Sequence, residues 1–276
     1  MNPVRVLIVS KGHAYDHNAF LAMFEAMEGV EATLVEQPAA HAALHPAFAD
    51  DWDVVFFYDM SGIAGIGLLH DGADNTGVPP DRYVQAIENL LQRGTGLILV
   101  NHATVSWPAW PLWREIHGSS FMLSEGELNG QVVPGSGYRG GHGPLPNATL
   151  ALHPLIAHPV LEGLAPGFEI TDELYLKSDN YGPRVLPLLR GDYAFVQANF
   201  TPPPLAPQAE KDAWAHAPGS DLIVWLNACR NSPVFVSDVG DGPLAFENPD
   251  YRRLIGNACR WLASSQARSW ASDSNS

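Results

Sequence analysis

Four short apolar runs, separated by segments with helical periodicity, constrain the fold of this chain more than any other feature. The runs cover residues 4–9, 32–35, 53–58 and 97–100, and most of their side chains are β-branched, leucine or aromatic. Near-continuous apolar runs of this length are typical of strands that are buried on both faces of a parallel sheet. Amphipathic segments follow the first run and precede the fourth, so the elements alternate as β-α-β-β-α-β. This order predicts a doubly wound α/β domain.

Capping signals place the ends of the predicted helices. The helix before the fourth strand is expected to end at Gly94, where a left-handed cap fits, and Asn248 is a suitable N-cap for the last helix. Beyond Ala263 the sequence is rich in serine and is expected to fray. The sequence therefore predicts one domain over residues 1–263 and a flexible tail over residues 264–276.

The second half of the chain has a looser pattern. Residues 118–143 are rich in Gly and Ser and are expected to form mainly loop, and residues 201–219 are expected to form a long surface loop. Several short apolar segments are spaced closely enough to add antiparallel strands to the sheet. These strand candidates are residues 149–152, 185–189, 193–198, 222–226 and 234–236.

The charge balance restricts the partners. The chain has 276 residues, with 15 Lys and Arg against 30 Asp and Glu, for a formal net charge of −15. Such a chain lacks the basic surface that nucleic acids or anionic lipids require. No apolar run is long enough to span a membrane, and the N-terminus does not resemble a signal peptide, so a cytoplasmic location is expected. The sequence predicts neither a nucleic-acid partner nor a membrane partner.

Polar side chains follow three of the predicted strands. In an open α/β sheet, ligands bind beyond the carboxyl ends of the strands, so these side chains are expected to meet at one edge. Two of these residues suit a structural role as well as a functional one: Asp16 as the N-cap of the first helix, and Asp59 in a turn. The candidates are His13, Asp16 and His17 after the first strand, Asp59 after the third, and Asn101 and His102 after the fourth.

The turn after the fourth strand contains no nucleophile of the usual kind. It reads V-N-H-A-T, without a cysteine and without a G-x-S-x-G motif. Cys229 and Cys259 lie in apolar segments and are expected to be structural, which argues against a cysteine-dependent amidotransferase. Trp107 begins a series of tryptophans spaced three apart, which suits stacking on a sugar but suits packing against the sheet better.

The second half contributes further candidates. His142 lies in the glycine-rich segment, and Asp172, Glu173 and Tyr175 follow in an apolar frame. Neighbouring residues of an extended chain point to opposite sides, so one carboxylate is expected to enter the site while the other holds a loop. The sequence alone leaves open which of the two does so.

These motifs, taken in order, resemble the trehalose-utilisation (ThuA-like) family, which has a class I glutamine-amidotransferase-like fold. The resemblance rests on GHAYDH at residues 12–17, on the His turn and Trp-rich segment at 99–118, and on HPVLEGL with DELY at 158–175. The chain departs from the family pattern at Gly240-Asp241, where the family usually has Gly-His. The resemblance implies a flavodoxin-like three-layer α/β/α sandwich, with a mostly parallel sheet and an antiparallel extension.

The resemblance also implies a role in carbohydrate catabolism, with a disaccharide or keto-glycoside as substrate. Two classes of function stay open: an enzyme that acts on a neutral sugar through a His/carboxylate site, and a non-catalytic carbohydrate-binding or regulatory module. No nucleotide cofactor is expected. A divalent metal such as Zn²⁺ or Mn²⁺ is an open question, with His102, His142 and Glu173 as candidate ligands. Whether the chain forms a homodimer is also open. The candidate catalytic residues are His102, His142, Glu173 and Asp172, and the candidate substrate-binding residues are His13, Asp16, His17, Asp59, Asn101, Trp107, Tyr175 and Asp241.

Overall fold

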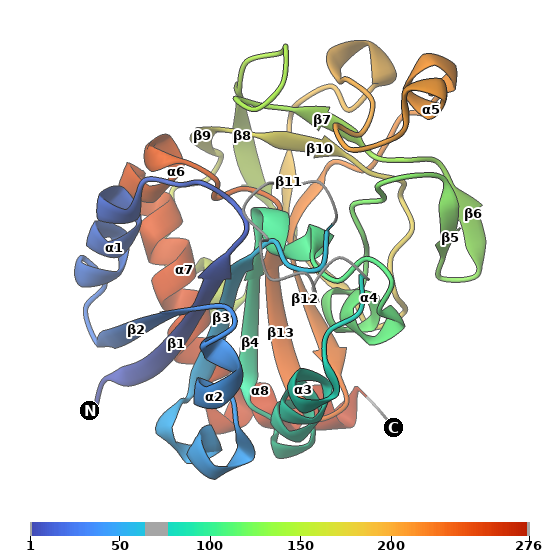
Figure 1. The fold of residues 1–276 in the computed structure, drawn as a ribbon. Coiled ribbons are helices and arrows are strands. Elements are labelled where there is room, and N and C mark those ends of the chain that lie inside the picture. The colour runs from blue at the N-terminus through green and yellow to red at the C-terminus, as the bar shows by residue number, and fades with distance from the viewer. Residues whose placement is uncertain (1, 64–76, 275–276) are drawn as a thin grey trace.

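The computed structural model describes residues 2–63 and 77–274, and within them a nine-stranded mixed sheet forms the centre of the molecule (Figure 1). Parallel pairing joins the first five strands of the spatial order, and antiparallel pairing joins the remainder. The predicted α/β fold class, with its antiparallel extension, is therefore confirmed. In spatial order the strands are β2 (Val30–Glu36), β1 (Val4–Lys11), β3 (Val54–Asp59), β4 (Gly96–Val100), β13 (Ser232–Ser237), β12 (Leu222–Cys229), β11 (Leu186–Gly191), β8 (Ala148–Pro154) and β9 (Phe168–Asp172).

Helices cover both faces of the sheet, so the molecule has three layers (Figure 1). Alternate residues of β1 show the division: Val6 and Ile8 join the apolar core under one set of helices, and Leu7 and Val9 join the core under the other. The first core packs against α1 (His17–Glu25), α6 (Pro243–Glu247), α7 (Pro249–Leu262) and α8 (Ser265–Asp273), and the second against α2 (Ala40–Ala43), α3 (Asp81–Arg93) and α4 (Pro111–His117).

Smaller elements stand beyond the carboxyl ends of the parallel strands or connect the layers. Residues 118–143, expected to be mainly loop, contain three short strands, two of which pair with each other, and residues 201–219 contain one short helix. The two-stranded sheets are β5 (Gly126–Leu128) with β6 (Gln131–Val133), and β7 (Gly137–Arg139) with β10 (Leu174–Leu176); the helix is α5 (Gln208–Ala213); and 3₁₀ turns cover Pro46–Asp51, Asn101–Val105, Pro159–Leu161 and Gln197–Asn199.

The capping predictions hold at both helices for which they were made. Gly94 adopts a φ of 74° and its amide bonds to the carbonyl of Leu90, which ends α3. The Asn248 side chain accepts hydrogen bonds from the amides of Asp250 and Tyr251 at the start of α7.

Two local predictions were wrong. The segment 264–276 is not a frayed tail over its described part, because α8 begins at a Ser264 cap and packs on the sheet. Its buried residues are the small Ala267 and Ala271, which give little hydropathy signal, while the Trp270 ring lies 5.6 Å from that of Trp261. Residues 193–198 form no strand; aromatic packing of Tyr193 and Phe195 produces the apolar pattern there.

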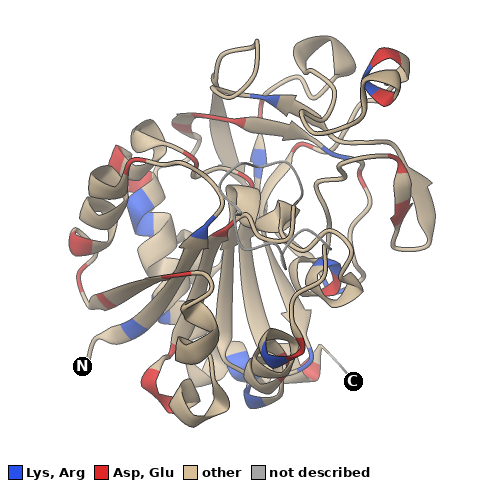
Figure 2. Cartoon of the chain, viewed as in Figure 1, with Lys and Arg blue, Asp and Glu red and all other residues tan. Residues whose placement is uncertain are grey.

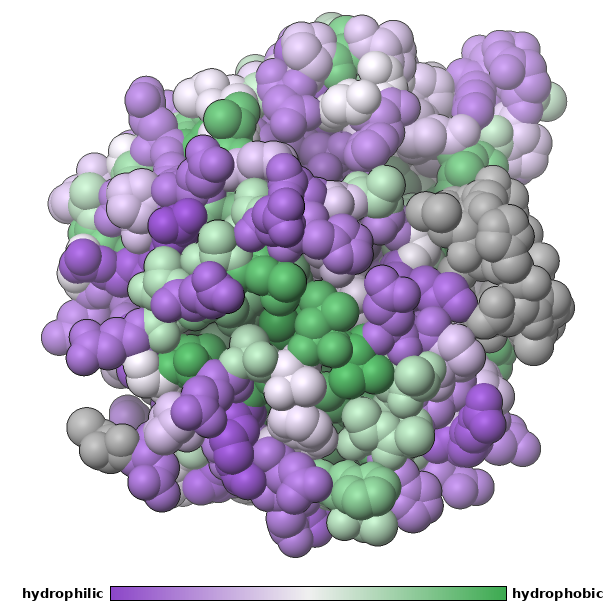
Figure 3. Space-filling view, turned by 60° about the vertical axis from the view of Figure 1, so that its left-hand side comes forward, coloured by the Kyte–Doolittle hydropathy of each residue, from purple (hydrophilic) through white to green (hydrophobic). Residues whose placement is uncertain are grey.

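The described surface carries no single block of charge. Acidic and basic residues are spread over several elements (Figure 2), and on one face apolar residues gather between hydrophilic ones (Figure 3). Among the described residues, no helix has both the length and the apolar character needed to cross a bilayer.

Candidate functional site

A cavity of about 350 Å³ opens beyond the carboxyl ends of the parallel strands. His13 lies two residues after β1, His102 lies two residues after β4, and Glu173 lies between β9 and β10. Apart from Tyr138, His142 and Tyr175, the remaining wall is apolar. The lining residues are Gly12, His13, Ala14, Met60, His102, Val105, Phe121, Leu123, Tyr138, His142, Glu173, Tyr175, Pro204 and Leu205.

Three histidine rings meet at one end of this cavity. The rings of His13 and His102 are stacked with centroids 4.2 Å apart, and the His142 ring meets His13 edge-on at 4.7 Å. Asp241, four residues beyond β13, adds a carboxylate to the group. Its Oδ1 lies 3.5 Å from His13 Nδ1 and 3.4 Å from His102 Nδ1, and its Oδ2 lies 3.9 Å from His142 Nε2. The structure thus brings together residues from four separate parts of the chain.

Backbone turns after β1 and β4 aim these side chains at the cavity. Gly12 has a φ of 82°, and a Cβ there would collide with the carbonyl of Met60, so only glycine permits the turn that presents His13. Asn101 has a φ of 50°, and its side chain is fixed by donating to the Asp238 carbonyl at 3.0 Å and accepting from the Tyr175 hydroxyl at 2.5 Å. Asn101 therefore supports the turn that presents His102.

The orientation of the His102 ring is set by a backbone carbonyl. His102 Nε2 lies 3.2 Å from the carbonyl oxygen of Tyr58, which can only accept, so Nε2 carries a proton. Nδ1 consequently faces the Asp241 carboxylate. The ring itself is only 2% exposed, which leaves it little freedom to turn.

The two adjacent carboxylates, Asp172 and Glu173, have different tasks. Asp172 points away from the cavity and accepts hydrogen bonds from the backbone amides of Glu173, Gly240 and Asp241. It therefore holds the loop that carries Asp241. Glu173 lines the cavity, accepts a hydrogen bond from the Tyr138 hydroxyl and lies 3.9 Å from His142 Nε2. The carboxylate that faces the site is Glu173.

Burial and neighbouring charges shift the pKa values of the carboxylates and of His13 at the site in different directions. Burial, followed by repulsion from the Asp241 carboxylate, raises the pKa of Glu173. Burial also raises the pKa of Asp172, to about 7. For Asp241, burial raises the pKa, but the neighbouring histidines, His102 first, outweigh burial and lower the pKa. Burial, with the neighbouring His102, lowers the pKa of His13 to about 3, so that this ring is neutral.

Six of the predicted substrate-binding residues do not line the cavity, and of these only Asp241 contacts the histidines that do. The other five lie elsewhere. Asp16 caps α1 through the Ala19 amide, and the exposed His17 ring stacks on Tyr15. The other three are buried in the fold itself. Asn101 supports the His102 turn, Asp59 accepts a 2.6 Å hydrogen bond from the Ser61 hydroxyl, and Trp107 packs in the apolar core beside Tyr83.

Tyr138 is the polar lining residue that the sequence analysis missed. It belongs to the short strand β7, where it pairs with Tyr175 of β10. Its hydroxyl donates to Glu173 and accepts from the His142 amide at 3.2 Å. Its position four residues before His142, in the segment GSGYRGGHG, was the available signal.

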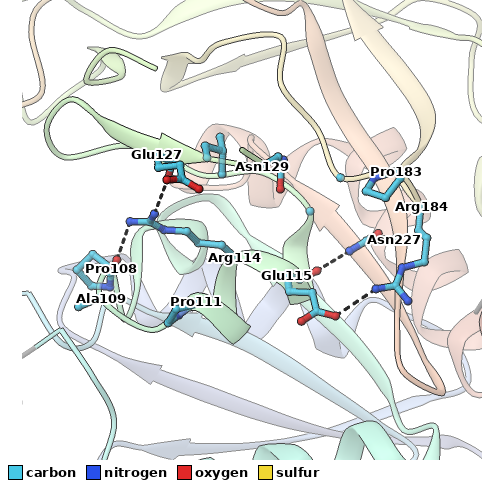
Figure 4. Close-up of a pocket in the computed structure, with 13 residues that line it drawn as sticks. Pro108, Ala109, Pro111, Arg114, Glu115, Glu127, Asn129, Pro183, Arg184 and Asn227 are labelled. Carbon is cyan, nitrogen blue, oxygen red and sulfur yellow. Dashed lines mark hydrogen bonds and ion pairs between the residues drawn. The ribbon is translucent and has the colours of Figure 1, made fainter. Parts of the chain in front are cut away.

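A second hollow, of about 410 Å³, lies between α4, the β5–β6 hairpin and the segment around residue 183 (Figure 4). Both arginines that line it already have partners within its walls. Arg114 donates to the backbone carbonyls of Glu127 and Pro108, and Arg184 forms a 3.1 Å ion pair with Glu115 (Figure 4). The hollow therefore presents few unpaired groups to a ligand, and the histidine cluster is the stronger candidate site.

Gly240 is expected to be indispensable for the site. Its φ is 124°, and a Cβ there would collide with the Tyr251 hydroxyl and lie 2.6 Å from Val100 Cγ1. Gly240→Ala should lower the free energy of unfolding by about 2–3 kcal/mol through strain and overpacking. Urea unfolding measures this loss. The matched control is Gly242→Ala, since no atom lies within 4 Å of a Cβ there, and it should change stability by less than about 0.5 kcal/mol. Equal effects in both variants would contradict the expectation.

The sheet order, the covering helices and the site beyond the strand ends define a glutamine-amidotransferase-like α/β protein. PurLQS from Thermotoga maritima shares this fold, with a TM-score of 0.51 and 14% identity over 95% of this chain and 100% of that chain. The turn after β4 carries His102, and the two cysteines are buried outside the cavity lining.

A family model for trehalose utilisation, ThuA, matches residues 5–262, and the chain belongs to this family. Two solved structures of putative ThuA-like proteins have the same fold. The one from Bacteroides uniformis is 17% identical over 96% of this chain and 93% of that chain, with a TM-score of 0.63. The one from Parabacteroides merdae is 16% identical over 95% and 91%, with a TM-score of 0.61. No functionally curated protein matches the chain.

Proposed function

We propose that this ThuA-family protein is an enzyme of carbohydrate catabolism that acts on a neutral disaccharide or keto-glycoside. The observation that carries the proposal is the convergence of His13, His102, His142, Glu173 and Asp241 at one cavity and its floor. Groups that exchange protons occur together in this way at sites of acid–base catalysis. Family membership in trehalose utilisation supports a sugar as the substrate.

The composition of the wall suits a small neutral ligand. None of the described lining residues is Lys or Arg, so the cavity offers no cation to a phosphate group. Phe121, Tyr175 and Leu205 provide apolar surface against which the carbon face of a sugar ring can pack. A volume of about 350 Å³ is in the range of small-molecule sites.

The arrangement supports proton transfer in two directions. Glu173 and Tyr138 border the histidine cluster, and Glu173 Oε1 lies 3.9 Å from His142 Nε2. In a hydrolysis, a water oxygen bonds to the anomeric carbon as the glycosidic C–O bond breaks, and a basic group of the histidine cluster accepts the proton that the water loses. Glu173 then delivers a proton to the departing oxygen, which balances the step.

A substrate screen with a His102 variant tests this proposal. Purified protein is incubated with trehalose, other disaccharides and their keto derivatives, and products are identified by mass spectrometry. On the sugar that gives product, His102→Ala should lower kcat by about 10–100-fold, because His102 holds the Asp241 carboxylate. His17→Ala, an exposed histidine outside the cavity, is the control and should keep full activity.

Two outcomes would contradict the enzyme proposal. Full activity of a folded His102→Ala protein would show that the His/carboxylate cluster takes no part in the reaction. Stabilisation by a sugar in a thermal-shift assay, with no product from any sugar under the same conditions, would instead favour a carbohydrate-binding module.

A further inference from the structure

The end of the cavity where the histidines meet has the donor atoms of a metal site. His13 Nδ1, the Nε2 of His142 and a carboxylate oxygen of Asp241 lie within 4.8 Å of one another. Among the described residues, no other group of three or more such side chains meets that criterion. Two imidazoles and one carboxylate form a recurrent ligand set for Zn²⁺ and other divalent first-row ions.

The spacing of these atoms suits a shared ion. Two ligands that each lie about 2.0–2.1 Å from a tetrahedral Zn²⁺ are about 3.3 Å apart. His13 Nδ1 and Asp241 Oδ1 are 3.5 Å apart, close to this value. His142 is more distant, at 3.9 Å from Asp241 Oδ2, but it lies between glycines and its side chain is 53% exposed. A small movement of this loop toward the other two ligands would complete the set.

The buried donor atoms lack other partners. Within the described residues, His13 Nδ1, His102 Nδ1 and Asp241 Oδ1 form no hydrogen bond, although none of the three is accessible to solvent. Buried polar atoms without a partner are rare in native proteins and often indicate an ion or a water molecule. Here the unpartnered atoms face one another, which points to a cation between them.

His102 belongs to the cluster but not to the ligand set. An imidazole nitrogen binds a metal in the plane of its ring. The rings of His102 and His13 are stacked at an angle of 18°, so an ion in the plane of His13 cannot also lie in the plane of His102. His102 instead places its Nδ1 against Asp241 Oδ1 and is anchored on the Tyr58 carbonyl. This makes it a positioning residue for the carboxylate ligand.

We propose that His13 Nδ1, His142 Nε2 and the Asp241 carboxylate bind one divalent cation of the zinc class, with a coordination position open to the cavity. The inference deepens the proposed function and rests on it for the sugar oxygen that would occupy the open position. Because metal binding itself needs no sugar, it can be measured separately from turnover.

Calorimetric titration of chelator-treated protein tests the ligand set directly. ZnCl₂ and MnCl₂ are the probes, with MgCl₂ as a comparison, since Mg²⁺ prefers oxygen ligands. One Zn²⁺ per chain is expected. His102→Ala should weaken binding by about 10–100-fold, and His13→Ala, His142→Ala and Asp241→Asn should weaken it further. His17→Ala is the control and should bind like the wild type.

Clear outcomes would overturn the inference. Absence of Zn²⁺ and Mn²⁺ binding to the folded wild-type protein would do so, as would wild-type affinity in His13→Ala and His142→Ala. His142 is exposed on a loop, so its variant keeps the test valid even if His13→Ala fails to fold. A protein that turns over a sugar but binds neither Zn²⁺ nor Mn²⁺ would refute the metal site and leave the proposed function standing. Metal binding without turnover of any sugar would instead support the metal site and refute the proposed function.

Discussion

Replacing Glu173 by glutamine is expected to lower kcat by about 10²–10⁴-fold, the range for loss of a general acid–base group. Glu173 is the carboxylate that faces the cavity, and it is buried beside Tyr138 and His142. Glutamine has the same shape and can still accept from the Tyr138 hydroxyl, but it cannot release or take up a proton. The loss should therefore appear in kcat rather than in KM or in stability.

Glu169→Gln is the matched control for this variant. Glu169 lies on the neighbouring strand β9 with its side chain exposed, so the change removes the same charge outside the cavity. Steady-state kinetics on the identified sugar, with circular dichroism for the fold, makes the comparison. A Glu173→Gln protein with wild-type kcat would show that this carboxyl group exchanges no proton in the reaction.

The parallel half of the sheet could be predicted because most of its strands are visible as apolar runs in the sequence. The runs that became β1, β3 and β4 are almost entirely apolar, which is typical of short strands buried on both faces. Helix α8 escaped prediction because its buried residues are alanines, whose packing depends on the sheet beneath them. The sequence shows the hydrophobic periodicity of an element, but it does not show the surface against which that element packs.

The same distinction applies to the candidate site. His13 and His102 were expected at one edge because the topology of a parallel sheet brings strand ends together. The choice between Asp172 and Glu173 could not be made from their order alone. It is decided by the amides of Gly240 and Asp241, which are 68 and 69 residues away from Asp172 and hold its carboxylate.

The buried ion pair between Lys177 and Asp238 should be the most sensitive electrostatic feature of the fold. Lys177 Nζ lies 2.6 Å from Asp238 Oδ2 and 4.3 Å from the centroid of the Trp225 ring, and both charged side chains are at most 4% exposed. Lys177→Met keeps most of the volume but leaves the Asp238 carboxylate buried without a cation. The free energy of unfolding should fall by about 3–5 kcal/mol, as measured by urea denaturation.

Two further variants separate the lost pairing from the lost side chain. The double variant Lys177→Met with Asp238→Leu removes both charges and should recover most of the stability, because an apolar pair needs no compensating ion. Arg190→Met disrupts the ion pair with Asp221, whose side chains are 56% and 43% exposed, and should cost less than about 1 kcal/mol. If Lys177→Met cost no more than Arg190→Met, or if the double variant were as unstable as Lys177→Met, the loss could not be assigned to an uncompensated buried charge.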